Sequence, residues 1–197
     1  MSSIRIGASG VANVCGYGFE SIRSYWEIKT GRKERPDTVW MQRGRENELR
    51  AITAVECDMG LLFSSTGSSF DDQHRLEAQF SDPVAWKLVM YPDGVLDETM
   101  LEVKCPRQLH DEVPMGYQIQ MQIGFMLGGF ERALYAEWTP RETRKWWVYP
   151  SRELGEQLMP WIKRFVGYIA KDTEPPDFRT VKKPTLSTLK TELIYAT

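Results

Sequence analysis

Two acids and a lysine in the middle of the chain have the types and spacing of a metal-dependent hydrolytic site. Asp93 lies in a Pro-Asp-Gly turn after the apolar run WKLVMYP, and Glu102 and Lys104 lie in the next apolar run, MLEVKCP. Alternate residues of a β-strand point to the same side, so Glu102 and Lys104 share one face of that predicted strand. Mg²⁺ prefers oxygen ligands, and a nearby lysine can lower the pKa of an attacking water or stabilise charge developing on phosphorus. The alternative interpretation is a turn aspartate and a solvent-exposed Glu–Lys ion pair.

Two further polar side chains are expected to reach the same site from helices. Glu48 lies on the apolar stripe of the predicted helix 38–58. A carboxylate on a core-facing stripe is costly unless it is paired or binds a metal, although Glu48 could also reach solvent from the edge of the stripe. Gln120 shares a face of the predicted helix 114–129 with Tyr117, and its amide could donate to a phosphate or orient a water.

The remaining pattern predicts the elements that position these side chains. Helices are predicted at 8–18, 19–31, 38–58, 114–129 and about 152–171, strands at 75–80, 86–92, 100–106, 132–138 and 145–150, a Ser/Gly-rich turn segment at 60–73, and a last helical turn near 189–195. Ser9 is the predicted N-cap of the first helix. This order predicts one α/β domain over 1–197, with a central mixed sheet flanked by helices, a core at about 38–150 and an extended tail at 172–197.

The composition predicts a soluble globular protein. Of 197 residues, 42% are hydrophobic and 26% are charged. No apolar stretch approaches the roughly 20 residues that cross a bilayer, and the N-terminus lacks a secretory signal, so no membrane partner is expected. Cys15, Cys57 and Cys105 form no CxxC pair, which argues against a zinc site or a disulfide framework and for a cytoplasmic location. The net charge of −2 does not identify a partner, because basic residues cluster in KTGRKER, RETRKWW and RTVKKP.

The motifs occur together in the order found in one nuclease family. They are IGAS at 6–9, GRENE at 44–48, PDG at 92–94, LEVKCP at 101–106 and Y-x-x-Q-x-Q at 117–122. In this combination the sequence resembles the phage-lambda-type alkaline exonucleases, the YqaJ-like viral recombinase branch of the PD-(D/E)xK nucleases. The resemblance covers residues 6–125 and is only general in the C-terminal third. It implies a restriction-endonuclease-like PD-(D/E)xK core.

The resemblance also implies roles for individual residues. The implied metal ligands, one of them a backbone carbonyl, are Asp93, Glu102, Val103 and Glu48. Lys104 would be the catalytic lysine, and Gln120 would lie near the attacking water or the terminal phosphate. The implied contacts to DNA or its 5′-phosphate are Ser9, Arg5, Tyr117 and Arg107.

Two positions depart from the family pattern. Relatives have an arginine well upstream of IGAS that helps to bind the 5′-phosphate, and Arg5 is a poor positional match for it. The residue before Pro-Asp-Gly is often a serine that touches phosphate, whereas here it is Tyr91. A preference for 5′-phosphorylated ends is therefore implied less directly than nuclease activity.

The function implied by the resemblance is 5′→3′ digestion of double-stranded DNA from its ends, which releases 5′-mononucleotides. Mg²⁺, with Mn²⁺ as a substitute, would act at two ions per active site without a nucleotide cofactor. A homotrimeric ring would enclose DNA, and the 3′ single-stranded tail would pass to a single-strand annealing protein in phage-type recombination, in the bacterial cytoplasm. Two alternatives are a PD-(D/E)xK endonuclease of restriction or junction-resolving type and a non-catalytic DNA-binding module.

Overall fold

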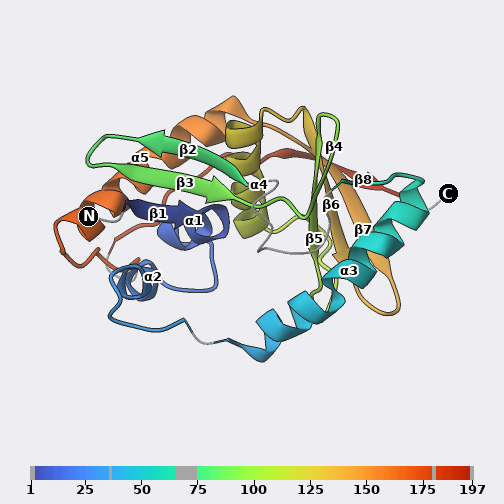
Figure 1. The fold of residues 1–197 in the computed structure, drawn as a ribbon, viewed down its shortest axis with the longest axis horizontal. Coiled ribbons are helices and arrows are strands. Elements are labelled where there is room, and N and C mark those ends of the chain that lie inside the picture. The colour runs from blue at the N-terminus through green and yellow to red at the C-terminus, as the bar shows by residue number, and fades with distance from the viewer. Residues whose placement is uncertain (1–2, 36, 65–74, 179–180, 196–197) are drawn as a thin grey trace.

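The described part of the chain forms two β-sheets and five helices, with the helix Met115–Gly128 (α4) between the sheets (Figure 1). This computed structural model describes residues 3–35, 37–64, 75–178 and 181–195. The other helices are α1 (Ala8–Val14), α2 (Ile22–Lys29), α3 (Val39–Met59) and α5 (Arg152–Ala170). The strands are β1 (Ile4–Gly7), β2 (Leu76–Phe80), β3 (Trp86–Met90), β4 (Gly94–Leu96), β5 (Thr99–Lys104), β6 (Arg132–Trp138), β7 (Thr143–Tyr149) and β8 (Lys190–Ile194).

Both sheets are mixed. The first has the order β1-β3-β2, in which β1 is parallel and β2 antiparallel to β3. The second has the order β4-β5-β6-β7-β8, and its one parallel pair, β5 and β6, is joined by a crossover that contains α4. This architecture confirms the predicted α/β class, although strands expected in one central sheet lie in two.

The longer helices begin and end close to the predicted residues. The Thr38 side chain accepts a hydrogen bond from the Met41 amide at 3.2 Å and caps α3. Helix α4 ends at Gly129, whose φ of 68° lies in the left-handed region. The prediction of Ser9 as an N-cap is wrong. Strand β1 runs directly into α1, so Gly7 occupies the capping position and Ser9 lies inside the first turn.

Short strands and the C-terminal tail differ from the sequence prediction. Strands β1 and β4 have only four and three residues, too few to show an alternating pattern. The predicted last helical turn near 189–195 is wrong, because residues 190–194 form β8 and pair with β7. Local sequence does not encode that pairing. Residues 65–73 of the predicted turn segment, and Arg179 of the RTVKKP cluster, lie outside the described residues.

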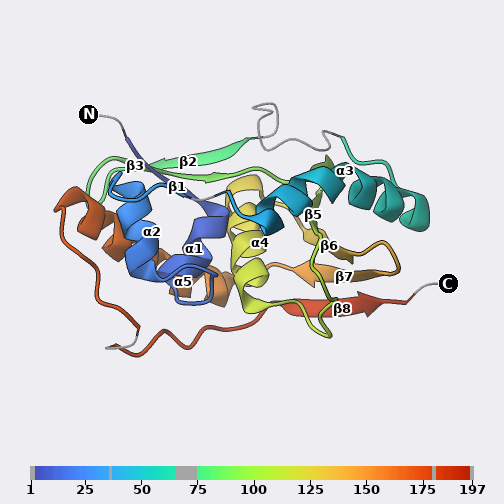
Figure 2. The ribbon, with the colours of Figure 1, turned by 90° about the horizontal axis from the view of Figure 1, so that it is seen from below.

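The second sheet has a hydrophobic cluster on each face. Helix α4 packs on one face, and α3 covers the other (Figure 2). Gly124 lets α4 approach the sheet, because a Cβ atom there would lie 2.5 Å from the Met100 sulfur. None of the described helices is long and apolar enough to cross a membrane. The two faces of β5 therefore see different helices.

Candidate active site

Strand β5 and the turn before β4 bring the predicted catalytic residues together. Glu102 is fully buried, and its Oε1 accepts hydrogen bonds from Lys104 Nζ and, at 2.6 Å, from Gln120 Nε2. Asp93 Oδ2 accepts a hydrogen bond from the Val103 amide at 2.6 Å. The same-face prediction for Glu102 and Lys104 and the α4 position of Gln120 agree with these contacts.

The position of Asp93 follows from the local strand pairing. Asp93 lies where the chain leaves β3 in the first sheet and enters β4 in the second (Figure 1). Its amide donates to the Leu101 carbonyl at 3.1 Å, and its side chain reaches Val103, beyond the last paired residues of β4 and β5. In an extended strand the amide and carbonyl of one residue point to the same side. The Val103 carbonyl therefore faces the Asp93 side of β5, while its side chain packs in the α3 cluster.

Three acids share this region with Lys104, whose side chain is only partly exposed. Burial raises the pKa of Glu102, Lys104 lowers it, and the charges of Asp93 and Glu48 raise it further. Burial also raises the pKa of Asp93, opposed by Lys104 and the hydrogen bond from the Val103 amide. Burial and the charge of Asp93 raise the pKa of Glu48, and Lys104 lowers it. The influence of Asp93 and Lys104 on the pKa of Glu48 agrees with the prediction that its side chain reaches this site.

One oxygen of Glu102 has the environment of a metal ligand. Within the described ranges, Glu102 Oε2 is buried and has no hydrogen-bond partner. A buried carboxylate oxygen without a partner is costly, and a cation would satisfy it. No three His, Cys, Asp or Glu side chains of the described residues already form a metal-binding cluster, since Glu102 Oε1 and Asp93 Oδ2 are turned to protein donors. The carboxylate oxygens of Glu102 and Asp93 are the type of donor that a hard cation prefers, and these residues would hold it.

Helix α4 contributes more than Gln120. The Tyr117 ring, predicted to contact DNA, has its centroid 5.5 Å from Lys104 Nζ, so it packs against the lysine. Two other glutamines of this helix accept hydrogen bonds from backbone amides far along the chain. Gln118 Oε1 accepts from the Leu189 amide at 2.8 Å, and Gln122 Oε1 accepts from the Ser151 amide at 2.9 Å. Of the three glutamines, Gln120 alone points to the acids.

The two positions that depart from the family pattern touch each other. Arg5 on β1 donates a hydrogen bond to the Tyr91 hydroxyl, and its guanidinium lies 5.6 Å from the centre of the Tyr91 ring. Ser9 is exposed on α1, and Arg107 is exposed beyond β5. No described contact joins Ser9 or Arg107 to the acids, so their predicted roles remain predictions.

Two cations near Arg5 were not predicted as site residues individually. Burial and the charges of Arg35 and Arg5 lower the pKa of Lys29. Lys29 and Arg35 lie 5.5 and 5.8 Å from the centre of the Tyr25 ring. A hollow of about 360 Å³ is lined by Ser3, Ile4, Arg5, Lys29 and Ile169. The sequence signal was the basic run KTGRKER, but its proximity to Arg5 depends on tertiary packing.

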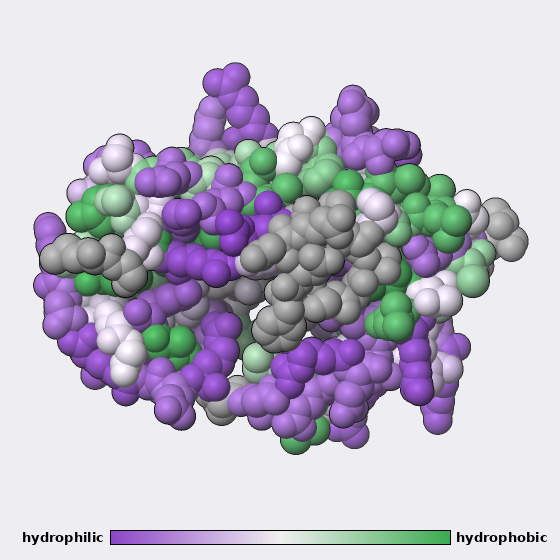
Figure 3. All heavy atoms as spheres, in the orientation of Figure 1, coloured by the Kyte–Doolittle hydropathy of each residue, from purple (hydrophilic) through white to green (hydrophobic). Residues whose placement is uncertain are grey.

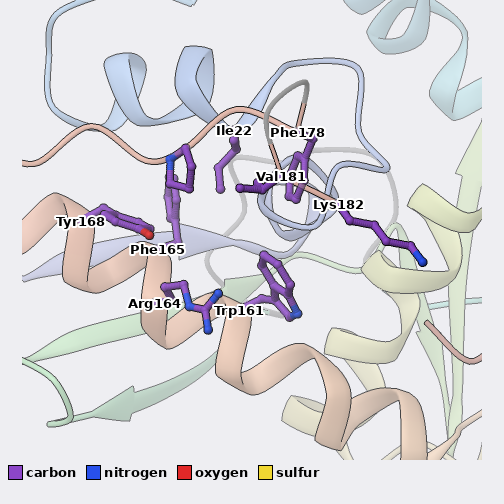
Figure 4. Close-up of a pocket in the computed structure, with 9 residues that line it drawn as sticks. Ile22, Trp161, Arg164, Phe165, Tyr168, Phe178, Val181 and Lys182 are labelled. Carbon is purple, nitrogen blue, oxygen red and sulfur yellow. The ribbon is translucent and has the colours of Figure 1, made fainter. Parts of the chain in front are cut away.

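A second hollow, of about 160 Å³, lies among α2, α5 and the tail. Figure 4 shows Ile22, Phe178 and Val181 on one side of it and Trp161 on the other. Its lining is apolar and aromatic apart from Arg164 and Lys182, and it contains no carboxylate. It therefore lacks the groups that the chemistry at Glu102 requires.

In Figure 3 the surface around the N-terminal half of α3 is mostly hydrophilic. In the space-filling view, the N-terminal half of α3 stands away from the part of the molecule that contains α2 (Figure 3). Glu48 lies in this half of α3 and is partly exposed. Asp93 and Lys104 are also partly exposed.

Comparisons with solved structures identify the fold. An alkaline exonuclease from Laribacter hongkongensis (LHK-Exo) is 17% identical, with a TM-score of 0.66 over 85% of this chain and 89% of that chain. Its complex with dAMP gives 16% identity and a TM-score of 0.62 over 85% and 88% of the two chains. A phage-related exonuclease from Haemophilus somnus 129PT is 16% identical, with a TM-score of 0.61 over 86% and 93%. These structures share the fold, and a search of curated proteins found no match.

A family model matches most of the chain and includes nearly all of the predicted site. The model, described as the YqaJ-like viral recombinase domain, matches residues 2–131. The match contains the acids, Lys104 and Gln120, and it ends just before β6. Together with the exonuclease fold, it favours a nuclease and confirms the resemblance read from the motifs. The chain belongs to the YqaJ-like viral recombinase family.

Proposed function

We propose that this protein is a metal-dependent exonuclease that digests duplex DNA 5′→3′ from an end and leaves a 3′ single-stranded tail. The observation that carries the metal-dependent nuclease assignment is the buried Glu102 carboxylate, and the direction and the end requirement rest on the family. One oxygen of Glu102 is bound by Lys104 and Gln120, and the other has no partner in the described part of the chain. The family and the exonuclease fold support the same class of reaction.

Asp93, Glu102 and the Val103 carbonyl would hold one divalent ion, and Glu48 would help to hold a second ion or its waters. Mg²⁺ is the expected ion and Mn²⁺ a substitute, because all four donors are oxygens. When bound, such ions activate a water and offset charge on the leaving oxygen. Burial, together with the charges of the neighbouring acids, raises the pKa of Glu48 and Glu102, and this crowding of carboxylates supports the assignment.

Lys104 would act in its protonated form. Burial alone would lower its pKa, but the charges of Glu102 and Asp93 raise it above the ordinary value. An ammonium group therefore faces the reacting phosphate and stabilises negative charge on it, and it is poorly suited to accept a proton from water. Gln120 fixes the Oε1 side of Glu102 and leaves Oε2 for a ligand.

The cations beside Tyr91 support a preference for a 5′-phosphorylated end. Arg5 touches Tyr91, two residues before Asp93. Lys29 lies close enough to Arg35 and Arg5 that, after burial, their charges lower its pKa. Ser9 is exposed on the helix that follows β1 and would add a hydroxyl donor. Arg107, and the exposed side of Tyr117, would contact the DNA backbone.

The products and partners follow from the same proposal. Hydrolysis of the terminal linkage would release 5′-mononucleotides, and the complex of LHK-Exo with dAMP supports that product class. A homotrimeric ring around DNA would give processivity without tight phosphate binding. The 3′ tail would pass to a single-strand annealing protein. Light scattering of the purified protein would test the trimer.

The proposal is tested with end-labelled linear duplexes, with and without a 5′-phosphate, incubated with Mg²⁺, Mn²⁺ or EDTA. We expect label at the 5′ terminus to appear as mononucleotide, faster with the 5′-phosphate, and only with metal. Lys104→Ala should be inactive, and Arg152→Ala, whose side chain is 92% exposed on α5, should match the wild type.

Three results would contradict the proposal in different ways. Equal activity of wild type and Lys104→Ala would remove the assignment of the site. Cleavage of covalently closed circles would favour the endonuclease alternative. DNA binding without cleavage, together with no Mn²⁺ binding by calorimetry, would favour a non-catalytic module.

A further inference from the structure

A second buried carboxylate lies one strand away from Lys104. Glu137 on β6 is fully buried and has three donors. Its Oε1 accepts from the Tyr135 hydroxyl at 2.6 Å and pairs with His110 Nδ1 at 2.8 Å, and its Oε2 accepts from the His110 amide at 2.8 Å. A carboxylate accepts, so Nδ1 carries the proton in this pair. Glu137 therefore fixes both the backbone and the ring of His110.

This pair belongs to the same face of the sheet as the acids. Lys104 is opposite Glu137 in the register of β5 and β6, and Glu137 is opposite Arg144 in that of β6 and β7. Directly opposed residues have Cβ atoms about 5 Å apart. The Tyr117 ring lies against both Lys104 and, with centroids 5.7 Å apart, Tyr135. The His110–Glu137 pair is thus next to the lysine proposed to face the reacting phosphate.

His110 presents one free nitrogen. Its side chain is 47% exposed although its partner Glu137 is fully buried, and no described residue hydrogen-bonds its Nε2. Arg144 holds the same loop from β7 by donating to the His110 carbonyl at 2.6 Å and to Asp111 Oδ1 at 3.0 Å. Two strands therefore orient a ring whose outer edge is open. If His110 served only to anchor the loop, its Nε2 edge would not need to face solvent.

We propose that His110, oriented by Glu137, binds a backbone phosphate adjacent to the scissile one in the DNA strand at the active site. The proposal rests on the nuclease function proposed above. A protonated imidazole donates from Nε2 to a phosphate oxygen, whereas the neutral ring with its proton on Nδ1 can only accept there. Glu137 is a positioning residue, because it orients His110 and would not itself contact the DNA.

The charged and titratable groups around the ring come from several elements. They are Lys104 on β5, Tyr135 and Glu137 on β6, Arg144 on β7, Tyr117 on α4, and Arg107 and Asp111 in the loop. The cations would compete with His110 for the phosphate only weakly, because Lys104 is engaged by Glu102 and Arg144 by the loop carbonyl.

The test measures the affinity for a short duplex end with Ca²⁺ replacing Mg²⁺ to suppress cleavage. A series of duplexes carries one neutral methylphosphonate at successive linkages near the end. Wild type, His110→Ala, His110→Arg and Glu137→Gln are compared, with Arg152→Ala as the control for loss of an exposed cation. Thermal unfolding of each variant shows how much of it is folded.

We expect His110→Ala to weaken binding about threefold to tenfold and to reduce the salt slope by about 0.7 to 0.9. At one linkage the methylphosphonate should weaken the wild type but not His110→Ala. His110→Arg should restore the affinity, and Glu137→Gln should lose the same linkage-specific effect while its backbone contact persists. Arg152→Ala should keep the wild-type pattern.

Equal methylphosphonate penalties in wild type and His110→Ala at every linkage would overturn the proposal. A lower melting temperature with unchanged DNA affinity would also overturn it, because His110 would then be an anchor only. If the wild type cleaves DNA but shows no such coupling, this inference alone fails. If it neither binds nor cleaves DNA, the proposed function fails as well.

Discussion

The two faces of β5 and β6 are built from alternating residues of the same strands and have opposite character. The face toward α3 carries Leu101, Val103, Leu134 and Ala136. The face toward α4 carries Glu102, Lys104, Tyr135 and Glu137 at its polar end. Because successive residues of these strands point to opposite faces, the same strands place apolar side chains on one face and the polar site residues on the other. At this end of the sheet, the α3 face is expected to contribute packing alone and the α4 face to carry the activity, while α4 packs on the rest of its face through a second hydrophobic cluster.

The polar face carries an energetic cost that the apolar face does not. Burial raises the pKa of Glu102 to about 8, and its Oε2 has no partner among the described residues. A buried charge also lies beside the α3 face: Lys145 on β7 forms an ion pair with Asp58 of α3. We therefore expect substitutions of the acids on the α4 face to reduce activity without loss of stability. Substitutions of apolar residues on the α3 face should reduce stability without loss of specific activity.

The largest expected effect is the loss of activity in Glu102→Gln, by about 10²- to 10³-fold or more. The same change should leave the metal-free protein as stable or more stable. Glu102 has a folded pKa above its usual 4.5, so in the wild type it binds its proton more tightly when folded. Its stability penalty is absent below about pH 4.5 and grows as the pH rises toward the raised pKa.

Denaturant unfolding in EDTA at about pH 5 and about pH 8 measures this difference. Glu102→Gln should gain stability relative to wild type at the higher pH. A loss of stability that is equal at both pH values would contradict the assignment of the cost to the ionised carboxylate. Asp93→Asn tests whether the neighbouring acid behaves in the same way.

Next in size is Leu134→Ala on the α3 face. Leu134 is fully buried against α3, so its truncation should cost about 2–5 kcal/mol of unfolding free energy. Activity per folded molecule should stay close to that of the wild type. Leu49→Ala, at a position on α3 that is 60% exposed, is the matched control and should change stability by less than about 0.5 kcal/mol. A large loss of specific activity in Leu134→Ala would show that the faces are not independent.

The ion pair on the α3 face should show an asymmetric response. Lys145 is 4% exposed and Asp58 49% exposed, so Asp58→Asn leaves a buried cation without its partner. We expect Asp58→Asn to cost about 1–3 kcal/mol and Lys145→Met to cost less. Chemical denaturation of both variants measures the difference. If Lys145→Met instead cost more unfolding free energy than Asp58→Asn, the ion pair would stabilise the fold by net attraction and not only offset the cost of burying Lys145.

The smallest expected effect is that of Gln120→Ala, a loss of about tenfold in activity with little change in stability. The substitution removes the 2.6 Å hydrogen bond that holds Glu102 Oε1. Gln120→Glu should be worse, because it adds a fourth acid to a site that already raises the pKa of its members. Steady-state rates on end-labelled duplex measure both. Equal rates for the two variants would point to a steric role for the side chain.

Alternation predicted that Glu102 and Lys104 share one face of β5, which their contact agrees with. The pattern alone left a solvent-exposed ion pair and a solvent-reaching Glu48 as alternatives, and the family resemblance supplied the shared site for Asp93, Glu48 and Gln120. The Arg5–Tyr91 contact was not predictable, because it needs the parallel pairing of β1 with β3, over 80 residues apart. The same holds for Glu137, whose importance depends on the register of β5 and β6.

The fold showed the same limit. Helices of 14 to 21 residues have strong local signals and were predicted. Ser9 was wrongly predicted as a cap because β1 has only four residues and could not be recognised before the helix. Strand β8 was missed because residues 190–194 become a strand by pairing with β7. Local patterns predict elements, but sequence-distant pairing decides how the strands are divided between sheets.

The glutamines of α4 give the end of the chain an influence on catalysis. Gln118 binds the backbone of the tail at Leu189, and Gln120, two residues later, binds Glu102. Half a turn of rigid helix therefore connects the C-terminal segment to the catalytic acid. Trimming or displacing the tail before residue 189 would release one anchor of α4 and loosen the grip on Glu102. We therefore expect cleavage of the tail before residue 189 to weaken the Gln120–Glu102 contact and to lower activity.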